Sequence, residues 1–466
     1  MYGRTHRIHL IGIGGSGMCG IAEVLLNMGY QVSGSDLKTS ETTDRLVELG
    51  GRVFAGHAPS NVEGAQVVVF STAVRGDNAE LRAAMAAGIP VIGRAEMLAE
   101  LMRMKYGIAV GGSHGKTTTT SLIASVLARG GLDPTIVVGG RLHAIGSNAR
   151  LGHGRFLVAE ADESDGSFLR LAPALTVITN IDREHMDHYK DTAELRQAFV
   201  YFANRVPFYG ASVLCVDDPV VRAILPEVTR RTLTYGLAED AEIRATDVEL
   251  GAGGARFTVH AFGSLLGEVR LRLHGRHNVL NALAALAVGR EIEIGFEHMA
   301  EALEGFTGVG RRFELKGEVA GVRVIDDYAH HPTEIRATLA AARAAAPAGR
   351  VLVIFQPHRY SRTQALAGEF GQAFGDADRV WVLDVYAAGE VPLPGIGGRT
   401  VVDSAHAAGA RHVAWAEDPA AAVREAVEAA CPGDRVMVLG AGDVWKLADG
   451  LLEGLRRQEA ALKDRG

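Results

Sequence analysis

The stretch V-G-G-S-H-G-K-T-T-T-T, Val110 to Thr120, follows a short apolar run and opens a helical pattern. A strand, a glycine-rich turn and a helix in this order form a cradle for a polyphosphate. Glycines let backbone N–H groups converge on the anion, and the helix N-terminus adds positive potential. We expect Lys116 to reach the terminal phosphates and Thr117 to offer its hydroxyl oxygen to Mg²⁺. The stretch therefore predicts a nucleoside triphosphate site.

The spacing of this loop is shorter than the common phosphate-loop motif. The pattern G-x-x-x-x-G-K-[ST] needs a glycine where Val110 stands, so the intact part is G-x-x-G-K-T. A chance G-K-T at a helix start is the alternative, but the strand before it and the helix after it favour the nucleotide site. The residues expected around the phosphates are Gly112, Ser113, His114, Gly115, Lys116, Thr117 and Thr118.

Length and composition exclude several classes of protein. A chain of 466 residues is too long for one hydrophobic core and predicts about three domains. A net charge of −7 gives no electrostatic reason to expect binding to nucleic acid or to an anionic membrane surface. No segment approaches the ~18 consecutive apolar residues of a membrane span. Three widely spaced cysteines indicate neither a disulfide framework nor a zinc site, and they fit a cytoplasmic protein.

The first hundred residues alternate short apolar runs with amphipathic stretches, which is the pattern of βαβ units on a parallel sheet. Their first turn, G-I-G-G-S-G from Gly12 to Gly17, is a complete G-x-G-x-x-G, and Asp36 ends the second predicted strand. This matches the dinucleotide fingerprint. The same turn could instead hold the diphosphate of another nucleotide, because both ligands present a pyrophosphate to a helix N-terminus.

The pattern changes twice along the chain, and this predicts three domains at 1–105, 106–308 and 309–466. The second contains the phosphate loop and, over Glu242 to Leu273, an alternation typical of a strand meander. The third alternates strands and helices again. The fold class we predict is α/β, with Rossmann-like first and third domains. The central domain has a mostly parallel sheet with a phosphate loop, plus a small antiparallel sheet.

Acidic and polar residues follow two predicted strands of the central block. E-A-D-E-S-D starts at Glu160, and N-I-D-R-E-H-M-D-H-Y contains Asn180, Asp182 and His185. Ligands of parallel sheets lie at the carboxyl ends of strands, so these residues should face the phosphate loop. They fit Mg²⁺ held by one or two protein groups, phosphate oxygens and water. A solvated acidic turn and an ordinary surface histidine are the alternatives.

Two further patterns could contact a nucleotide or a carboxylate. Asn278 and Asn281 lie one turn apart on a predicted helix, where their amides could hydrogen-bond an adenine edge or serve as caps. Arg359 and Arg362, in Q-P-H-R-Y-S-R-T, can present two guanidinium groups to carboxylates or phosphates. Exposed ion pairs are the alternative for the arginines.

Eight motifs, in order along essentially the whole chain, resemble those of the Mur ligase family. They are H-L-I-G-I-G-G-S-G-M-C-G-I-A, G-S-H-G-K-T-T, E-A-D-E-S-D, N-I-D-R-E-H-M-D-H-Y, G-R-H-N-V-L-N-A, G-V-G-R-R-F-E, D-D-Y-A-H-H-P-T-E and Q-P-H-R-Y-S-R-T. The resemblance implies a first domain for a UDP moiety, a central ATPase and a third domain for an amino acid. It is closest to the branch that joins L-alanine to UDP-N-acetylmuramate.

The resemblance also implies roles for individual residues. Lys116, His185, His330 and Arg359 would be catalytic, and Thr117, Glu160 and His185 would surround two Mg²⁺ ions, for which Mn²⁺ could substitute. Asn278, Asn281, Arg312 and Asp327 would join the phosphate loop in binding ATP. The sugar nucleotide and the amino acid would meet Gly14, Gly15, Ser16, Gly17, Asp36, Ser71, Thr72, Arg94, His330, Arg359 and Arg362. The segment 193–208 lacks the lysine that sister ligases carbamylate, which agrees with the alanine-adding branch.

The expected reaction is ATP-dependent amide formation through an acyl phosphate, in a monomer or a homodimer. A nicotinamide-dependent dehydrogenase would explain the first glycine turn but would leave Lys116, Glu160 and His185 without a role. A nucleotide-regulated binding protein would use the phosphate loop as a switch. Within the ligases, the alternative is a recycling enzyme that attaches a tripeptide to the same sugar nucleotide.

Overall fold

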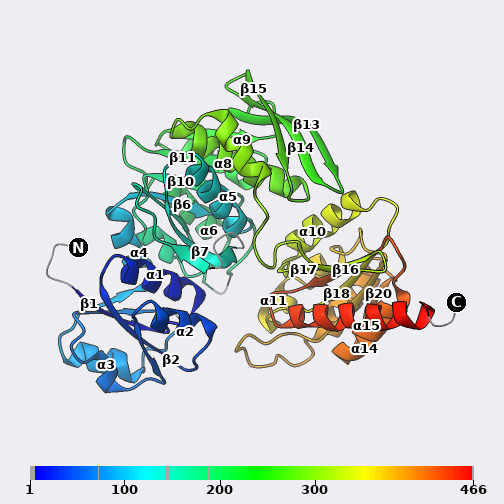
Figure 1. The fold of residues 1–466 in the computed structure, drawn as a ribbon, viewed down its shortest axis with the longest axis horizontal. Coiled ribbons are helices and arrows are strands. Elements are labelled where there is room, and N and C mark those ends of the chain that lie inside the picture. The colour runs from blue at the N-terminus through cyan, green and yellow to red at the C-terminus, as the bar shows by residue number, and fades with distance from the viewer. Residues whose placement is uncertain (1–5, 72, 143–146, 187, 464–466) are drawn as a thin grey trace. The chain divides into compact units, whose positions relative to one another are not determined.

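The computed structural model describes residues 6–71, 73–142, 147–186 and 188–463, so Thr72 lies outside the described residues. Three sheets organise the chain (Figure 1). The chain divides into two compact units. The first comprises residues 1–246, 258–269 and 280–307, and the second comprises 247–257, 270–279 and 308–466. The three sheets confirm the predicted α/β class, while the domain boundaries near 105 and 309 stay a prediction.

The first sheet is parallel throughout and has the strand order β3-β2-β1-β4-β5. Its elements are β1 (Arg7–Ile11), α1 (Ser16–Asn27), β2 (Gln31–Asp36), α2 (Glu41–Glu48), β3 (Arg52–Ala55), η1 (Pro59–Val62), β4 (Val67–Phe70), α3 (Ala79–Ala86), β5 (Val91–Gly93) and α4 (Arg94–Arg103). This order is that of a dinucleotide-binding sheet. It places the glycine turn Gly12 to Gly17 at the carboxyl end of β1, where Gly12 has a positive φ of 77°.

A buried carboxylate, Glu80 at the start of α3, links several parts of this sheet. Its oxygens accept hydrogen bonds from Ser35 Oγ at 2.5 Å and from Asn61 Nδ2 at 2.5 Å, and His9 Nε2 lies 3.4 Å away. His57 Nδ1 is 3.5 Å from the same carboxylate. Burial by itself raises the pKa of Glu80, but the hydrogen bonds from His9, Ser35 and Asn61 outweigh burial and lower the pKa to about 2.

Replacing Glu80 by glutamine should make folding less stable in a pH-dependent manner. The folded pKa lies below the unfolded value of 4.5, so the stabilisation is present above pH 4.5 and is lost as the pH falls towards 2. The shift corresponds to about 3 kcal/mol of the free energy of unfolding. Urea unfolding of Glu80→Gln and wild type at several pH values measures this. The exposed Glu63→Gln is the control, and a difference that stays constant from pH 7 to pH 3 would contradict the prediction.

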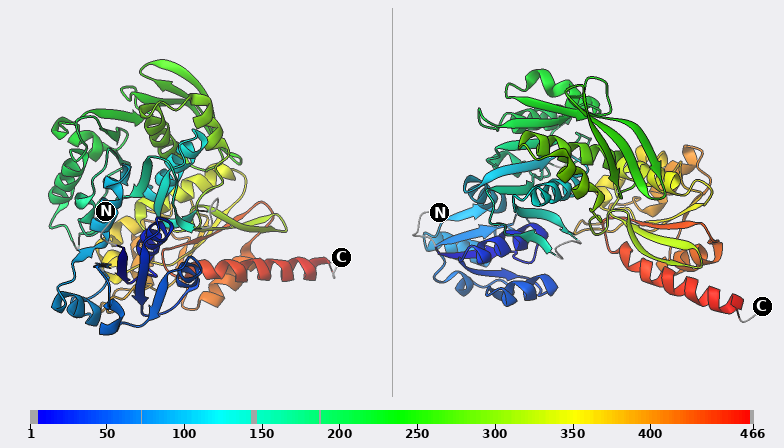
Figure 2. Two further views of the ribbon diagram at one scale, coloured as in Figure 1. Left: turned by 60° about the vertical axis from the view of Figure 1, so that its left-hand side comes forward. Right: turned by 45° about the horizontal axis from the view of Figure 1, so that its top comes forward.

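The central sheet has ten strands in the order β15-β14-β13-β12-β11-β10-β6-β9-β7-β8 (Figures 1 and 2). Its strands are β6 (Tyr106–Gly111), β7 (Thr135–Leu142), β8 (Ser147–Arg150), β9 (Phe156–Glu160), β10 (Leu175–Ile178), β11 (Ala211–Cys215), β12 (Thr232–Gly236), β13 (Ile243–Gly251), β14 (Gly254–Ala261) and β15 (Ser264–Leu271). Its helices are α5 (Lys116–Arg129), η2 (Ser167–Arg170), α6 (Thr192–Ala203), α7 (Pro219–Ile224), η3 (Leu225–Glu227), α8 (Arg276–Glu291) and α9 (Phe296–Glu304).

The predicted strand meander becomes β13, β14 and β15, which are joined by two-residue turns. Such short turns require antiparallel neighbours. Because β13 pairs in parallel with β12, the meander continues the edge of the main sheet and does not form a separate one. The first two sheets share a core, in which α1 lies against β7 and β8. This contact fixes the glycine turn relative to the central sheet within the first unit.

The third sheet has the order β16-β17-β21-β18-β19-β20, and only β16 is antiparallel to its neighbour. Its strands are β16 (Glu314–Val319), β17 (Val322–Asp327), β18 (Val351–Phe355), β19 (Arg379–Val382), β20 (Val413–Trp415) and β21 (Arg435–Leu439). Its helices are α10 (Pro332–Ala345), α11 (Tyr360–Ala365), α12 (Ala367–Gly371), α13 (Gly398–Ala407), α14 (Pro419–Ala429), η4 (Val444–Lys446) and α15 (Leu447–Lys463). Helices cover both faces: one core contains α10, α12 and α13, and the other contains α14 and α15.

Among the described residues, no helix is both long and apolar enough to cross a membrane.

Candidate functional site

The predicted phosphate loop connects β6 to α5 with a strongly constrained backbone. Gly112 has a φ of 129° and Gly115 a φ of 81°, a region that side chains rarely adopt. A Cβ at Gly112 would lie 2.1 Å from Thr179 Oγ1, and one at Gly115 would lie 2.7 Å from Asn281 Oδ1. Both glycines are therefore required by conformation and by close approach. The helix starts at Lys116, as the sequence predicted.

Lys116 is anchored inside the site by a carboxylate. Its Nζ donates to Glu163 Oε2 at 2.8 Å and Oε1 at 3.0 Å, and also to the carbonyl oxygen of Gly112 at 2.7 Å. Burial by itself lowers the pKa of Lys116, but Glu163 and Asp162 outweigh burial and raise it. The ammonium group is thus charged and aimed across the mouth of the loop, where a polyphosphate would lie.

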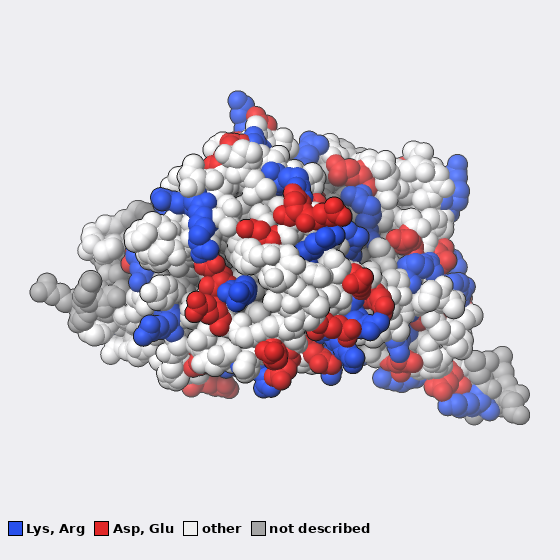
Figure 3. Space-filling model, turned by 90° about the horizontal axis from the view of Figure 1, so that it is seen from above, with Lys and Arg blue, Asp and Glu red and all other residues white. Residues whose placement is uncertain are grey.

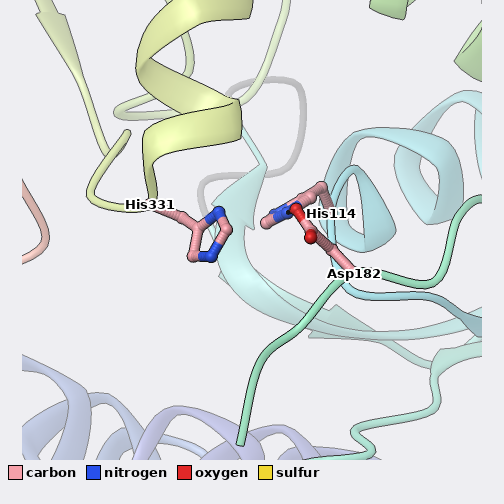
Figure 4. A group of neighbouring side chains, drawn as sticks. All are labelled: His114, Asp182 and His331. Atoms are coloured by element: carbon pink, nitrogen blue, oxygen red, sulfur yellow. Dashed lines mark hydrogen bonds and ion pairs between the residues drawn. The ribbon is translucent and has the colours of Figure 1, made fainter. Parts of the chain in front are cut away.

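The segment after β10 holds the loop from the other side. His114 Nε2 lies 2.9 Å from Asp182 Oδ2, and Figure 4 shows these two side chains in contact. The backbone N–H of His114 donates to Asn180 Oδ1 at 2.8 Å, and Thr179 Oγ1 donates to the carbonyl oxygen of His114 at 2.6 Å. Asn180 and Asp182 were predicted to face this loop. Both side chains contact His114 of the loop and hold it in place.

Three side chains near Lys116 could hold a metal ion together: Glu163, Glu184 and His185. Their ligand atoms all lie within 4.8 Å of one another. His185 Nε2 is 3.6 Å from Glu163 Oε1, and His185 has a positive φ of 57°. Glu163 and Glu184 are buried, and Lys116 is already the counterion of Glu163. Carboxylate oxygens are ligands that Mg²⁺ prefers, so this donor set fits that ion.

The sequence analysis selected Glu160 from the acidic motif, and its role stays a prediction; the structure brings Glu163 of the same motif to Lys116 and His185. Glu160 is half-buried at the end of β9 and does not belong to this group of three. The position of Glu163 in the turn after β9 is the feature that could have indicated it. A carboxylate in the turn beyond a strand reaches further over the phosphate loop than a carboxylate still in the strand. Glu184, next to His185 in the predicted motif, was missed as well.

The two asparagines of α8 have different surroundings. Asn281 is buried, and its Oδ1 accepts a hydrogen bond from Thr119 Oγ1 of α5 at 3.1 Å. It therefore supports the helix that follows the phosphate loop. Asn278 donates from Nδ2 to the carbonyl oxygen of His274 at 2.8 Å. Thr117 and Thr118 are buried in the first turn of α5.

Asp36, the acidic residue predicted to accompany the glycine turn after β1, accepts a hydrogen bond from that turn. The backbone N–H of Gly14 donates to Asp36 Oδ2 at 2.9 Å. A Cβ at Gly17 would lie 2.9 Å from Arg94 Nη1, so Arg94 reaches the start of α1. Burial by itself raises the pKa of Asp162 in the acidic segment, but Lys116, the hydrogen bonds of Ser164 and Arg94 together lower it. Ser71 follows β4, and Gly15 and Ser16 open α1.

In the second unit, Asp327 ends β17 and is buried. Its carboxylate accepts hydrogen bonds from the backbone N–H groups of Phe313 at 2.7 Å and Ala329 at 2.8 Å. Arg312 lies over the ring of Tyr328, 5.0 Å from its centroid, and 3.9 Å from Glu334. Burial raises the pKa of Asp327 against the attraction of Arg312. The two predicted ATP contacts of this unit thus share one neighbourhood.

His330 and Arg362, two of the predicted carboxylate-binding residues, both contact His358, which the sequence analysis did not select. The rings of His358 and His330 meet edge to face with their centroids 5.6 Å apart, and Arg362 Nη1 donates to His358 Nδ1 at 3.3 Å. Burial, and then His330 and the arginines, lower the pKa of His358 to about 3, so it is neutral. Arg359 caps α11 with a strained φ of 68°. This strain is typical of functional loops.

Three family models match consecutive parts of the chain. They are Mur ligase family, catalytic domain, over residues 7–106; Mur ligase middle domain over 110–289; and Mur ligase, glutamate ligase domain, over 311–442. The chain is 54% identical to a UDP-N-acetylmuramate–L-alanine ligase of Geobacter sp. (strain M21), over 98% of this chain and 99% of that protein. It is 53% identical to the protein of the same name from Geobacter sulfurreducens, over 99% and 100%.

Solved structures agree in fold. A UDP-N-acetylmuramate-alanine ligase from Thermotoga maritima matches with a TM-score of 0.80 at 29% identity, over 97% of this chain and 99% of that one. A murein peptide ligase from Psychrobacter arcticus matches with a TM-score of 0.70 at 22% identity, over 97% and 98%. The second likeness shows the fold alone.

Proposed function

Because the chain belongs to the Mur ligase family, we propose that it performs the reaction for which its full-length relatives are named. It is an ATP-dependent ligase that joins L-alanine to UDP-N-acetylmuramate in peptidoglycan synthesis. The structural observation that best supports this proposal is the phosphate loop, in which Lys116 is charged and is held by buried Glu163. Substrates of this kind and three free cysteines fit the cytoplasm.

The proposed reaction passes through an acyl phosphate. The muramoyl carboxylate attacks the γ-phosphorus of ATP, the bond to the β–γ bridging oxygen breaks, and ADP leaves. The amine of alanine then displaces phosphate from the acyl carbon. Lys116 and the N–H groups of the loop stabilise the charge that develops on the phosphoryl oxygens. Positioning supplies much of the rest, since no protein nucleophile is required. His330, Arg359 and Arg362 would orient the two carboxylates, and His330 is our candidate for accepting the ammonium proton.

Mg²⁺ would be held by Glu163 and His185 with the hydroxyl of Thr117, and Glu184 adds a second buried carboxylate. When bound, the ion would neutralise phosphate charge and orient the γ-phosphoryl group. The family resemblance implied two ions with Glu160 as a ligand. We propose that Glu163 takes that role, because its carboxylate contacts both Lys116 and the His185 imidazole.

Two alternatives have less support. The recycling ligase that attaches a tripeptide shares the fold, but relatives at 52% and 54% identity over almost the whole chain are named as alanine ligases. A dehydrogenase would need the pyrophosphate turn alone and gives no role to the Lys116 and Glu163 pair. The binding protein with a nucleotide switch would bind ATP without releasing phosphate.

Phosphate release from the purified protein tests the proposal. The assay contains Mg-ATP and UDP-N-acetylmuramate, with L-alanine, glycine, the tripeptide or no amino acid. Release that requires both the sugar nucleotide and L-alanine is expected. Glycine should react less efficiently, since one methyl group contributes only about 1–3 kcal/mol to selectivity. Release with the tripeptide alone would favour the recycling ligase, and ATP binding without release would favour the binding protein.

Replacing Asp36 by alanine should weaken binding of the sugar nucleotide. The Gly14 N–H loses its 2.9 Å acceptor, so the turn that would hold the diphosphate is no longer closed. A hydrogen bond to a charged group contributes about 1.5–3 kcal/mol, which predicts a KM for UDP-N-acetylmuramate raised about 10- to 100-fold. Steady-state kinetics measure this, with the exposed Asp44→Ala as the matched control. An unchanged KM would contradict the role of Asp36.

A further inference from the structure

A second concave site lies at the opposite ends of the strands that carry the phosphate loop. It is a pocket of about 900 Å³ within the first unit. Its walls come from the segments that precede β6, β9, β10 and β12 and from the segment that follows α6. Pockets for small molecules measure about 300–1,000 Å³, so its size suits one such ligand.

This pocket is distinct from the nucleotide site. Tyr106 opens β6 at the pocket, and Gly111 ends the same strand at the phosphate loop. A strand rises about 3.3 Å per residue, so the five steps from Tyr106 to Gly111 separate the two sites by about 17 Å. The ATP of the proposed reaction would lie at the carboxyl ends of these strands, which leaves their amino ends unassigned.

The lining of the pocket is cationic in a protein whose net charge is −7. None of its lining residues, all of them described, carries a carboxylate. By contrast, the face drawn in Figure 3 carries both signs interspersed. The basic lining residues are Arg103, Lys105, His153, Arg155, Arg205 and Arg230. Such an excess of one sign in a concave surface attracts anions.

Three of these guanidinium groups keep their charge unneutralised. Arg205 donates to the carbonyl oxygen of Leu171 at 3.2 Å, and Arg230 donates to that of Asn204 at 3.4 Å. Among the described residues, no carboxylate lies within ion-pair distance of Arg155, Arg205 or Arg230. Guanidinium groups without a carboxylate partner are well suited to bind phosphate oxygens.

Lys105 and Arg103, two further cations of the lining, already have partners. Lys105 Nζ donates to the carbonyl oxygens of Gly152 at 2.8 Å and Gly154 at 2.7 Å, which holds its ammonium group in place. Asp133, which acts on Lys105, is itself paired with Arg150, and Arg103 is paired with Glu100. The carboxylates around the pocket are therefore already engaged with cations.

Aromatic rings complete the site. Tyr106 is 48% exposed and Tyr209 is 60% exposed, although tyrosine rings are usually well covered. Tyrosine presents a flat apolar face together with a polar hydroxyl, and rings of this kind stack on the rings of ligands. Exposed rings beside guanidinium groups that have no carboxylate partner favour a ligand that has both a ring and phosphate groups.

We propose that this pocket binds a phosphorylated small molecule that bears an aromatic ring. The guanidinium groups of Arg155, Arg205 and Arg230 receive its phosphate oxygens, and Tyr106 and Tyr209 receive its ring. The site is separate from those of ATP and UDP-N-acetylmuramate. The proposal goes beyond the ligase reaction and does not depend on it.

The test uses pyranine, a fluorescent pyrene trisulfonate, as an aromatic trianion. It is titrated into the full-length protein with saturating Mg-ADP and UDP-N-acetylmuramate, so that the reaction sites are filled. We expect one binding site per chain, weakened at least tenfold in the double variant Arg155→Ala/Arg230→Ala. Arg82→Ala, which removes an exposed arginine elsewhere in the same unit, should bind as wild type does. The double variant should also retain ligase activity.

Competition then identifies the ligand class. Phenyl phosphate should displace pyranine far better than inorganic phosphate or phenol does, since only phenyl phosphate has both ring and charge. Equal displacement by inorganic phosphate would overturn the requirement for a ring. The whole site is overturned if wild type does not bind pyranine, or if the double variant binds it with unchanged affinity.

Discussion

Lys116→Ala is expected to lose ligase activity by about a thousandfold or more. The Lys116 ammonium is the charged group that the phosphate loop aims at the transferring phosphoryl group, and its position is fixed by two oxygens of Glu163. Removal of a single preorganised donor to a developing charge commonly costs 10²- to 10³-fold in kcat, and this donor carries a full charge. Quenched-flow detection of the acyl phosphate, together with steady-state phosphate release, measures the loss.

The control is Lys190→Ala, which removes an exposed lysine from the same domain. A second control is Lys116→Arg, which keeps the charge but not the compact ammonium, and should recover only part of the activity. Circular dichroism should show that Lys116→Ala is folded, although burial of Glu163 without its partner will lower its stability. Wild-type turnover in Lys116→Ala would refute the assignment of the loop.

The phosphate loop could be predicted from sequence because its chemistry is local. The glycines, Lys116 and the start of α5 all lie within one short motif, and the structure reproduces each of them. The same is true of the Gly12 to Gly17 turn and of Asp36, whose spacing depends only on the βαβ unit. The family resemblance, which rested on several such motifs, is confirmed by the family models and by close relatives.

Contacts between distant segments could not be predicted in the same way. Glu80 contacts His9, Ser35 and Asn61, and no spacing in the sequence indicates that these four residues meet. The short elements α2 and β3 carry little signal in the sequence, because β3 has a half-exposed pattern and α2 is mostly polar. Tertiary packing decides such short elements more than local preference does.

The choice between Glu160 and Glu163 shows that prediction from sequence is limited even within one motif. Both belong to E-A-D-E-S-D, and sequence alone places the whole motif at a strand end. Only the turn after β9 determines which carboxylate points to Lys116. That turn is shaped by the hydrogen bond from the Ser164 N–H to Asp162 Oδ1 at 3.1 Å. A difference of three residues therefore separates the predicted metal ligand, Glu160, from the proposed one, Glu163.

Glu163→Gln is accordingly the variant that separates the two assignments, with Glu160→Gln as its matched partner. Glutamine keeps the size of the side chain but removes the negative charge from a fully buried position. Lys116 then loses its counterion and the group with Glu184 and His185 loses a carboxylate. We expect the Mg²⁺ concentration for half-maximal activity to rise at least tenfold, and kcat to fall by about 10²-fold or more.

Glu160→Gln should change both quantities far less, because Glu160 is half-buried and lies outside that group. Stability gives an independent readout. Breaking a buried ion pair costs about 3–5 kcal/mol in the free energy of unfolding, and Glu163→Gln breaks the pair with Lys116. Titrating Mg²⁺ at fixed ATP in both variants, alongside urea unfolding, compares them directly. If Glu160→Gln raises the Mg²⁺ requirement and Glu163→Gln does not, the metal lies at the end of β9, as the family resemblance implied, and Glu163 serves only to anchor Lys116.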